Sequence, residues 1–127
     1  MDASYTCPAG AKNAPYDLHA TADADNPTSQ KVDVRSVSAV MVLAAVHGDW
    51  QQKVGSEYDA GQVQFSPTTI GAGSKAKLQV TIPSACTNGP HQPAAADYGD
   101  YVVKLTVTTS AGTFKLTSSN KHRIQAG

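Results

Sequence analysis

Three oxygen-bearing side chains lie close together in 23-DADN-26 and suggest a calcium site. Asp23, Asp25 and Asn26 offer hard oxygen ligands of the kind that Ca²⁺ binds. The segment departs from the D-x-D-x-D-G-x5-E calcium loop, and a calcium ion takes about six to eight oxygens. In an extended strand Asp23 and Asp25 would share one face and simply meet solvent together. We therefore expect a solvent-facing strand here and keep these three residues as the calcium candidate.

Trp50 and Tyr58 are the candidates for sugar binding. Both lie in the polar, glycine-punctuated segment 47–61, which reads mostly as loop, and Trp50 is the only tryptophan. A flat aromatic ring can stack against the apolar face of a pyranose, which is how many β-sandwich modules hold carbohydrate. A single tryptophan in a polar loop equally suits packing over the end of a sandwich. A carbohydrate-binding module using these two rings is thus the alternative function.

The sequence contains none of the catalytic or metal-binding motifs that we looked for. No G-x-S-x-G nucleophile motif occurs, and Glu57 is the only glutamate. None of the four histidines, His19, His47, His91 and His122, stands within metal-ligand spacing of another histidine or a cysteine. We expect no catalytic residues, no bound metal and no cofactor, with a small secreted hydrolase as a third reading.

Cys7 and Cys86 are the only cysteines, and they predict a disulfide. Neither belongs to a C-x-x-C pair, and an even count in a small β-rich chain is typical of extracytoplasmic proteins. The bond would close a loop of about 79 residues and stabilise the fold by about 4 kcal/mol. Two buried free thiols in a cytosolic protein are the alternative. Met1–Ser4 lacks the basic region and apolar core of a signal peptide, so an exported protein would carry its signal sequence outside this chain.

Charge and hydropathy exclude two classes of partner. Ten basic residues balance ten acidic ones in the 127-residue chain, so no basic field attracts nucleic acid. The most apolar run, 39–46, is far shorter than the ~20 residues that span a bilayer. We therefore expect neither nucleic-acid binding nor membrane insertion.

Apolar residues alternate with polar ones along most of the chain, which predicts strands. The run 39–46 is apolar on both faces and fits a buried strand or a buried helix; its valines favour the strand. A bend is expected near 36–38, Pro83 should end a strand, and 110–112 should be a hairpin turn with Gly112 in the left-handed region. The tail should extend the last strand as far as Ile124. The predicted strands are 16–24, 31–35, 39–46, 62–65, 75–82, 101–109 and 113–118.

The stretch 97-DYGDYVV-103 resembles the tyrosine corner of immunoglobulin-like domains, D-x-[GA]-x-Y-x-C. It stands where that motif does, after a long connection and before the penultimate strand. The resemblance implies that Tyr101 is a core residue whose hydroxyl bonds to the corner backbone, that Gly99 permits a close approach, and that Asp97 fixes the turn. Val103 replaces the family's cysteine, so the usual inter-sheet disulfide is not expected.

Together these patterns predict an all-β, immunoglobulin-like two-sheet antiparallel sandwich of about seven strands. Residues 1–15 would form an extended lead-in and 16–127 a single domain. The expected role is a non-catalytic extracytoplasmic module for spacing, adhesion or protein–protein contact in a longer exported protein. Its partner would be a protein or polysaccharide at the cell surface. By analogy at the level of the fold, the 47–61 loop and the 110–112 turn would share one end of the sandwich as a binding rim.

Overall fold

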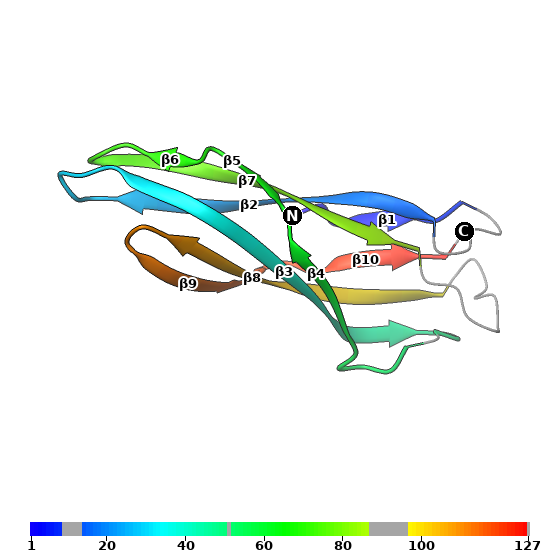
Figure 1. Cartoon of the computed structure of the whole chain (residues 1–127). Helices are drawn as coiled ribbons and strands as arrows, with labels where there is room; N and C mark the ends of the chain where they lie inside the picture. The colour runs from blue at the N-terminus through cyan, green and yellow to red at the C-terminus, as the bar shows by residue number, and fades with distance from the viewer. Residues whose placement is uncertain (9–13, 51, 87–96, 127) are drawn as a thin grey trace.

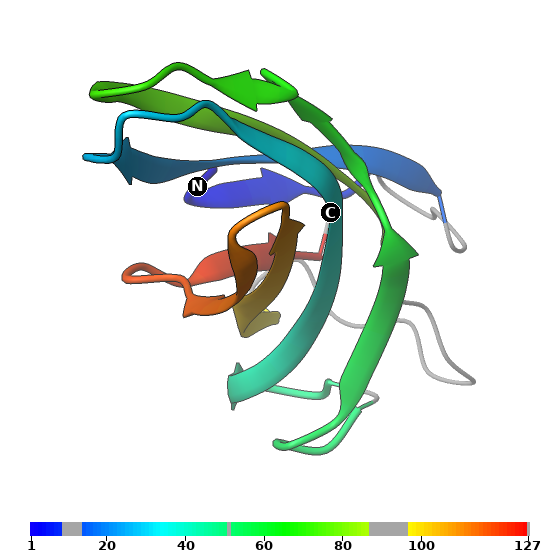
Figure 2. The same ribbon diagram turned by 60° about the vertical axis from the view of Figure 1, so that its left-hand side comes forward.

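The computed structural model describes residues 1–8, 14–50, 52–86 and 97–126, which form strands and no helix. Consequently, no described segment provides a helix that could cross a bilayer. The strands lie in two layers (Figures 1 and 2), so the all-β prediction is confirmed. The strands are β1 (Ser4–Thr6), β2 (Pro15–Asn26), β3 (Val32–His47), β4 (Glu57–Gln62), β5 (Gln64–Ser66), β6 (Thr69–Ile70), β7 (Ser74–Ala85), β8 (Tyr98–Thr109), β9 (Gly112–Thr117) and β10 (His122–Gln125).

The strand order is that of an immunoglobulin-like sandwich. One sheet runs β1-β10-β8-β3-β4, with β6 pairing beside β3 and β9 beside β8; the other runs β2-β7-β5. In immunoglobulin domains the B, E and D strands share one sheet and the C, F and G strands the other. Here β2, β7 and β5 correspond in order to strands B, E and D. The strands β3, β8 and β10 correspond in order to C, F and G.

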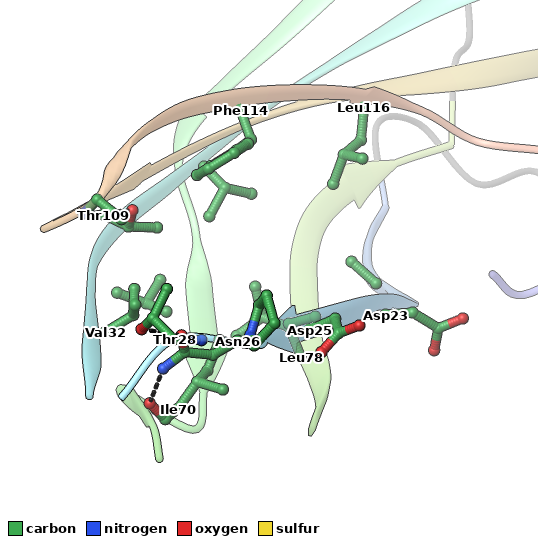
Figure 3. A pocket seen from close by; sticks show the side chains of 16 residues that line it. Asp23, Asp25, Asn26, Thr28, Val32, Ile70, Leu78, Thr109, Phe114 and Leu116 are labelled. Atoms are coloured by element: carbon green, nitrogen blue, oxygen red, sulfur yellow. Dashed lines mark hydrogen bonds between the residues drawn. The ribbon is translucent and has the colours of Figure 1, made fainter. Parts of the chain in front are cut away.

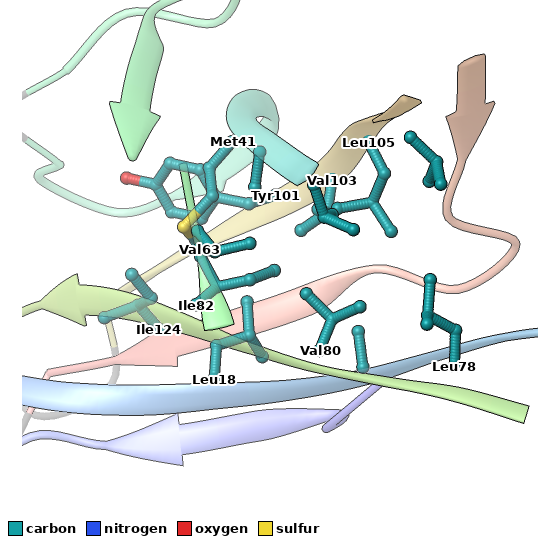
Figure 4. Packing of buried hydrophobic residues seen from close by; sticks show 14 of the residues in the cluster. Leu18, Met41, Val63, Leu78, Val80, Ile82, Tyr101, Val103, Leu105 and Ile124 are labelled. Carbon is teal, nitrogen blue, oxygen red and sulfur yellow. The ribbon is translucent and has the colours of Figure 1, made fainter. Parts of the chain in front are cut away.

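The inward faces of the two sheets meet in one apolar core, shown in Figure 4. The side chains that alternate inward from β7 meet those of β3 and β8, as a sandwich core requires. Fully or almost fully buried members of this core include Leu18, Met41, Leu43, Val80, Ile82, Val103 and Ile124.

The apolar run 39–46 is strand, as its valines indicated. It belongs to the 16-residue β3, which pairs with β8 along most of its length. The register shifts between Val34 and Ser36 and again between Leu43 and Ala45. The first shift lies next to the bend predicted at 36–38. Such bulges let a long strand bend and keep its inward face on the core.

Three local expectations are wrong. Residues 57–61 of the predicted loop 47–61 belong to β4, which adds to the edge of β3. Pro83 does not end β7, although proline has no N–H to donate. The neighbouring strand β5 pairs only with Gln79–Thr81, so no hydrogen bond between β5 and β7 requires an N–H at Pro83. The tail does not extend β9; the chain bends after it and forms β10, which pairs with the first residues of β8.

The N-terminal segment lies between the two sheets on one open side of the sandwich. Its strand β1 pairs with β10 in parallel, while the Asp2 N–H donates to the His19 carbonyl of β2, 2.9 Å away. The Cys7–Cys86 disulfide joins the end of this segment to the end of β7, with the Cα atoms 5.9 Å apart. Figure 1 places the N-terminus about halfway along the sandwich, so the segment closes only one half of that side.

His122 is fully buried beneath this segment. Its Nδ1 lies 2.9 Å from the Asp2 carbonyl, and its Nε2 lies 2.7 Å from the Tyr16 hydroxyl. Because a carbonyl only accepts, Nδ1 carries the proton and Nε2 accepts from the tyrosine. Burial lowers the pKa of His122, and burial likewise raises the pKa of Tyr16 to about 12. Tyr5 of β1 stacks on Tyr16, with ring centroids 3.9 Å apart.

Removing the disulfide should release the N-terminal segment and destabilise the whole domain. Replacing both Cys7 and Cys86 by Ser is expected to lower the free energy of unfolding by about 4 kcal/mol, because the unfolded chain regains the entropy of an open loop. Urea unfolding of the variant measures this loss. The wild-type protein in reductant is the control and should lose as much; unchanged stability in both would show that the bond contributes nothing.

Acidification should destabilise the fold through His122. Because its folded pKa lies below the ordinary value of 6.5, the unfolded chain binds the proton more readily. The stability is complete above pH 6.5 and falls as the pH drops below that value toward the lowered folded pKa. Unfolding curves from mildly alkaline to mildly acidic pH should show this slope in the wild type and a flatter one in His122→Gln. An identical slope in the two proteins would refute the role of His122.

Candidate functional site

An apolar cleft of about 320 Å³ opens between β2 and β9, on the half of the side that the N-terminal segment leaves uncovered. Figure 3 shows Phe114 and Leu116 projecting from β9 toward Leu78, Ile70 and Val32 across the gap. The apolar residues that line the cleft are Ala22, Ala24, Pro27, Val32, Val34, Ile70, Leu78, Val107, Ala111, Phe114 and Leu116. The cleft is therefore a continuation of the core that is open to solvent.

The cleft exists because two edge strands face each other with little between them. Within the described ranges, β2 pairs only with β7, and β9 pairs only with β8. Phe114 and Leu116 point inward from β9 yet remain 52% and 41% exposed. On β2 the facing positions are the small Ala22 and Ala24, which are too short to fill the space. The side chains of β2 and β9 are thus too small or too far apart to fill the space between the two sheets at this point.

Asn26 holds the β2 end of the cleft in place. Its side-chain amide donates to the carbonyls of Gln30, Ile70 and Gly71 at 2.7–3.1 Å. Its oxygen accepts from the N–H of Thr28 at 3.2 Å and from the Thr28 hydroxyl at 2.7 Å. The buried Asn26 thereby ties β2 to the chain around β6 at this rim of the cleft.

The β8–β9 turn holds the opposite rim. The Thr109 hydroxyl donates to the Gly112 carbonyl at 2.9 Å and accepts from the Ala111 N–H at 3.0 Å. Gly112 has a φ of 131°, a conformation that favours glycine, as the hairpin reading of 110–112 predicted. The turn therefore starts β9 in the register that directs Phe114 into the cleft.

The calcium candidate has another explanation. The side-chain oxygen of Asn26 is occupied by Thr28, and Asp23 lies 3.7 Å from Lys77 on the outer face of the sheet. In the described part of the chain, no group of three or more histidine, cysteine or acidic side chains is placed to hold a metal ion. Asn26 thus has a structural role, the two aspartates lie exposed at the free edge of β2, and calcium binding stays a prediction.

Trp50 and Tyr58 differ in their surroundings. The Trp50 indole lies over Gly99, where an added Cβ would come within 2.6 Å of its Nε1. That N–H donates to the Tyr101 hydroxyl, 3.2 Å away, so the ring packs against the end of the core. Tyr58 lies on β4 opposite Met41 and is 45% exposed. Only Tyr58 offers an open ring, and carbohydrate binding by this pair stays an untested prediction.

The motif 97–101 alternates between the core and the surface. Tyr101 is buried, and its hydroxyl donates to the Gln52 side chain at 2.9 Å. Asp97 is buried as well, and its carbonyl accepts from the Ala126 N–H at 2.9 Å. The preceding connection, 87–96, lies outside the described residues, so the backbone bond of a tyrosine corner remains a prediction. In this structure Gly99 makes room for Trp50.

Tyr98 and Asp100 face outward and tie three strands together. Arg123 of β10 donates to both Asp100 oxygens at 2.8 and 3.0 Å, and its guanidinium lies 3.6 Å from the centre of the Tyr98 ring. His47 of β3 also stacks with Tyr98, with ring centroids 5.0 Å apart. These contacts give the two outward-facing positions of the motif a structural role.

The predicted binding rim is wrong, because its two loops lie at opposite ends of β8. In the antiparallel pair β3–β8, His47 meets Tyr98 at one end and Val34 meets Thr109 at the other. The turn 110–112 therefore flanks the cleft, and the loop after His47 does not. The sequence singles out three residues that line the cleft, Asp23, Asp25 and Asn26, but as a calcium candidate. It does not predict the apolar lining, although the inward alanines of β2 are a usable signal. Three small residues at alternate positions, Ala20, Ala22 and Ala24, leave an inward face short of volume.

Tyr101→Phe should lower the free energy of unfolding by about 1–3 kcal/mol, because the hydroxyl of this buried tyrosine would no longer accept from the Trp50 N–H or donate to Gln52. Chemical unfolding followed by tryptophan fluorescence measures both the stability and the change around Trp50. Tyr58→Phe, which removes a hydroxyl from a half-exposed ring, is the matched control and should leave both unchanged. Equal stability of the two variants would contradict the role of the Tyr101 hydroxyl.

No protein-family model matches the chain, and no curated protein matches it. A search of solved structures finds the ASH/PapD-like domain of human CEP192 (PapD-like domain 7). That domain is 14% identical, with a TM-score of 0.42, and the alignment covers 100% of this chain and 82% of that one. The strand order described above places this chain among immunoglobulin-like sandwiches independently of that comparison.

Proposed function

We propose that this chain is a non-catalytic protein-binding module that takes an extended segment of a partner into the cleft between β2 and β9. The observation that supports it is the open apolar cleft bordered by two strand edges that no described strand pairs. An extended segment can satisfy both features, since its backbone bonds to an edge and its alternate side chains enter the cleft.

The exposed apolar side chains favour a bound partner. Leaving Phe114 and Leu116 in water forgoes the stabilisation that their burial would provide, about 25 cal/mol per Å² of apolar surface. An uncovered edge also invites pairing with other chains, and charges along it, such as those of Asp23 and Asp25, restrict which chains can pair. Here β2 is 12 residues long and its free half borders the cleft. This combination suits an interaction site better than a purely structural spacer.

The disulfide supports an extracytoplasmic location for the module. A bond between two buried cysteines persists in oxidising compartments and is uncommon in the reducing cytosol. The balanced charge argues against nucleic acid as the partner, so the proposed partner is a protein outside the cytoplasm, either secreted or at the cell surface.

Filling the cleft should abolish binding while the fold is retained. In Ala24→Phe the new ring would occupy the space below Phe114, and the melting temperature should hold or rise because apolar surface becomes buried. A displayed library of random peptides, selected on wild type and variant, measures the effect for a ligand of any sequence. The wild type should enrich peptides with alternating apolar residues, and Ala24→Phe should not.

The control for that selection is Gln79→Phe, which adds the same ring to the exposed outer face of β7. It should enrich the same peptides as the wild type. Enrichment of one peptide family on both the wild type and Ala24→Phe would place binding elsewhere, and no enrichment on the wild type would contradict the proposed function.

A further inference from the structure

The backbone of β2 shows how a partner segment would bind. The His19 carbonyl accepts from the Asp2 N–H, and the His19 N–H donates to the Asp2 carboxylate at 2.8 Å. His19 therefore directs both backbone groups away from β7. Because these groups alternate sides along a strand, Thr21, Asp23 and Asp25 direct theirs to the same free edge. That edge borders the cleft.

The N-terminal segment sets the direction of a strand at this edge. Asp2 lies beside His19, and the disulfide holds Cys7 to Cys86, whose N–H donates to Ala14. The segment therefore runs antiparallel to β2, and it covers β2 only as far as its middle. A second cavity, of about 410 Å³, reaches from Met1 along Ala22 and Asp23 to Leu116. The path of the segment thus leads directly into the cleft.

The side chains of β2 divide the cleft into an apolar interior and an acidic rim. Ala22 and Ala24 face inward, so a residue paired with either would direct its side chain toward Phe114 and Leu116. Asp23 and Asp25 face outward, and a residue paired with either would share the outer face with a carboxylate. Opposite charges in such cross-strand pairs attract and like charges repel.

The strand β7, which pairs with the opposite edge of β2, already alternates basic and apolar residues in this way. On β7, Lys77 stands opposite Asp23 and Lys75 opposite Asp25. The residues that alternate with these lysines, Ala76 and Leu78, face inward. The Lys77–Asp23 distance is 3.7 Å and the Asp23 side chain is 89% exposed, so the carboxylate can also meet a cation from the free edge.

We infer that the partner segment is a basic, alternating strand that pairs antiparallel with the free edge of β2. Its apolar side chains fill the cleft over Ala22 and Ala24, and its Lys or Arg residues stand outward opposite Asp23 and Asp25. This inference rests on the proposed function and adds to it the chemistry and direction of the partner.

Two synthetic peptides, acetyl-KVKLKV-amide and acetyl-EVELEV-amide, test the inference. They share an apolar face and differ only in the charge of the outward residues. Titrated into ¹⁵N-labelled protein, the basic peptide should bind about tenfold more tightly, as two cross-strand charge pairs would give. Amide signals of 21–25 and 112–117 should shift, and the amides of Thr21, Asp23 and Asp25 should exchange more slowly.

A charge-reversal variant and its control separate specific pairing from general attraction. Replacing Asp23 and Asp25 by Lys should reverse the preference, so that the acidic peptide binds more tightly. Replacing the exposed Asp17 and Glu57 by Lys changes the net charge equally but lies outside the cleft, and the preference for the basic peptide should persist. Reversal by the control pair as well would overturn the inference.

The remaining outcomes distinguish this inference from the function on which it rests. Equal binding of both peptides in the cleft would overturn the basic partner and leave the protein-binding role standing. Shifts of the same amides with protein concentration alone, accompanied by dimers in sedimentation, would assign the cleft to a second copy and overturn a separate partner. No shift with either peptide would overturn the strand chemistry, and the library selection would then decide independently whether the cleft binds protein at all.

Discussion

Two packed sheets exclude water from their shared core only where something closes the side between their edge strands. In this protein one such side lies between β2 and the strands β9 and β10, and the N-terminal segment closes half of it. A sandwich whose edges separate must either fill the gap with side chains, cover it with chain or leave it wet. Along this side the N-terminal segment covers one half and the other half stays open, and the open half is the candidate site.

The closed half is stabilised by several unlike interactions at once. A disulfide ties the segment to β7, the Tyr5 ring stacks on Tyr16, and His122 bonds to both the segment and β2. These bonds compensate for the short length of β1, which offers only a three-residue ladder. They also make the closure sensitive to reduction and to acid. The open half has none of these bonds and keeps small residues where large ones would be expected.

The edge strands explain why the open half suits recognition. A strand that presents unpaired backbone groups beside an apolar cleft offers affinity through the backbone and selectivity through alternate side chains. On β2 the inward alanines supply space and the outward aspartates supply charge. Selectivity would then depend on charge, and affinity on how well apolar side chains fill the cleft. Side-chain hydrogen bonds hold the rims of the cleft at Asn26 and Thr109, and a site formed in advance needs less ordering when a partner binds.

The amino-acid sequence by itself determined the fold class, most strands and the cysteine pair. Alternation in 75–82 and 101–109 and the glycine turn at 110–112 are local signals, because the period of a strand and the φ of a turn depend on neighbouring residues. The same local reading failed at Pro83 and at 57–62, where the presence or absence of a pairing strand decided the outcome. Only the tertiary structure showed that Phe114 and Leu116 face Ala22 and Ala24 across an open gap. The two pairs come from strands far apart in the sequence, and whether an inward face is covered depends on which distant segment reaches it.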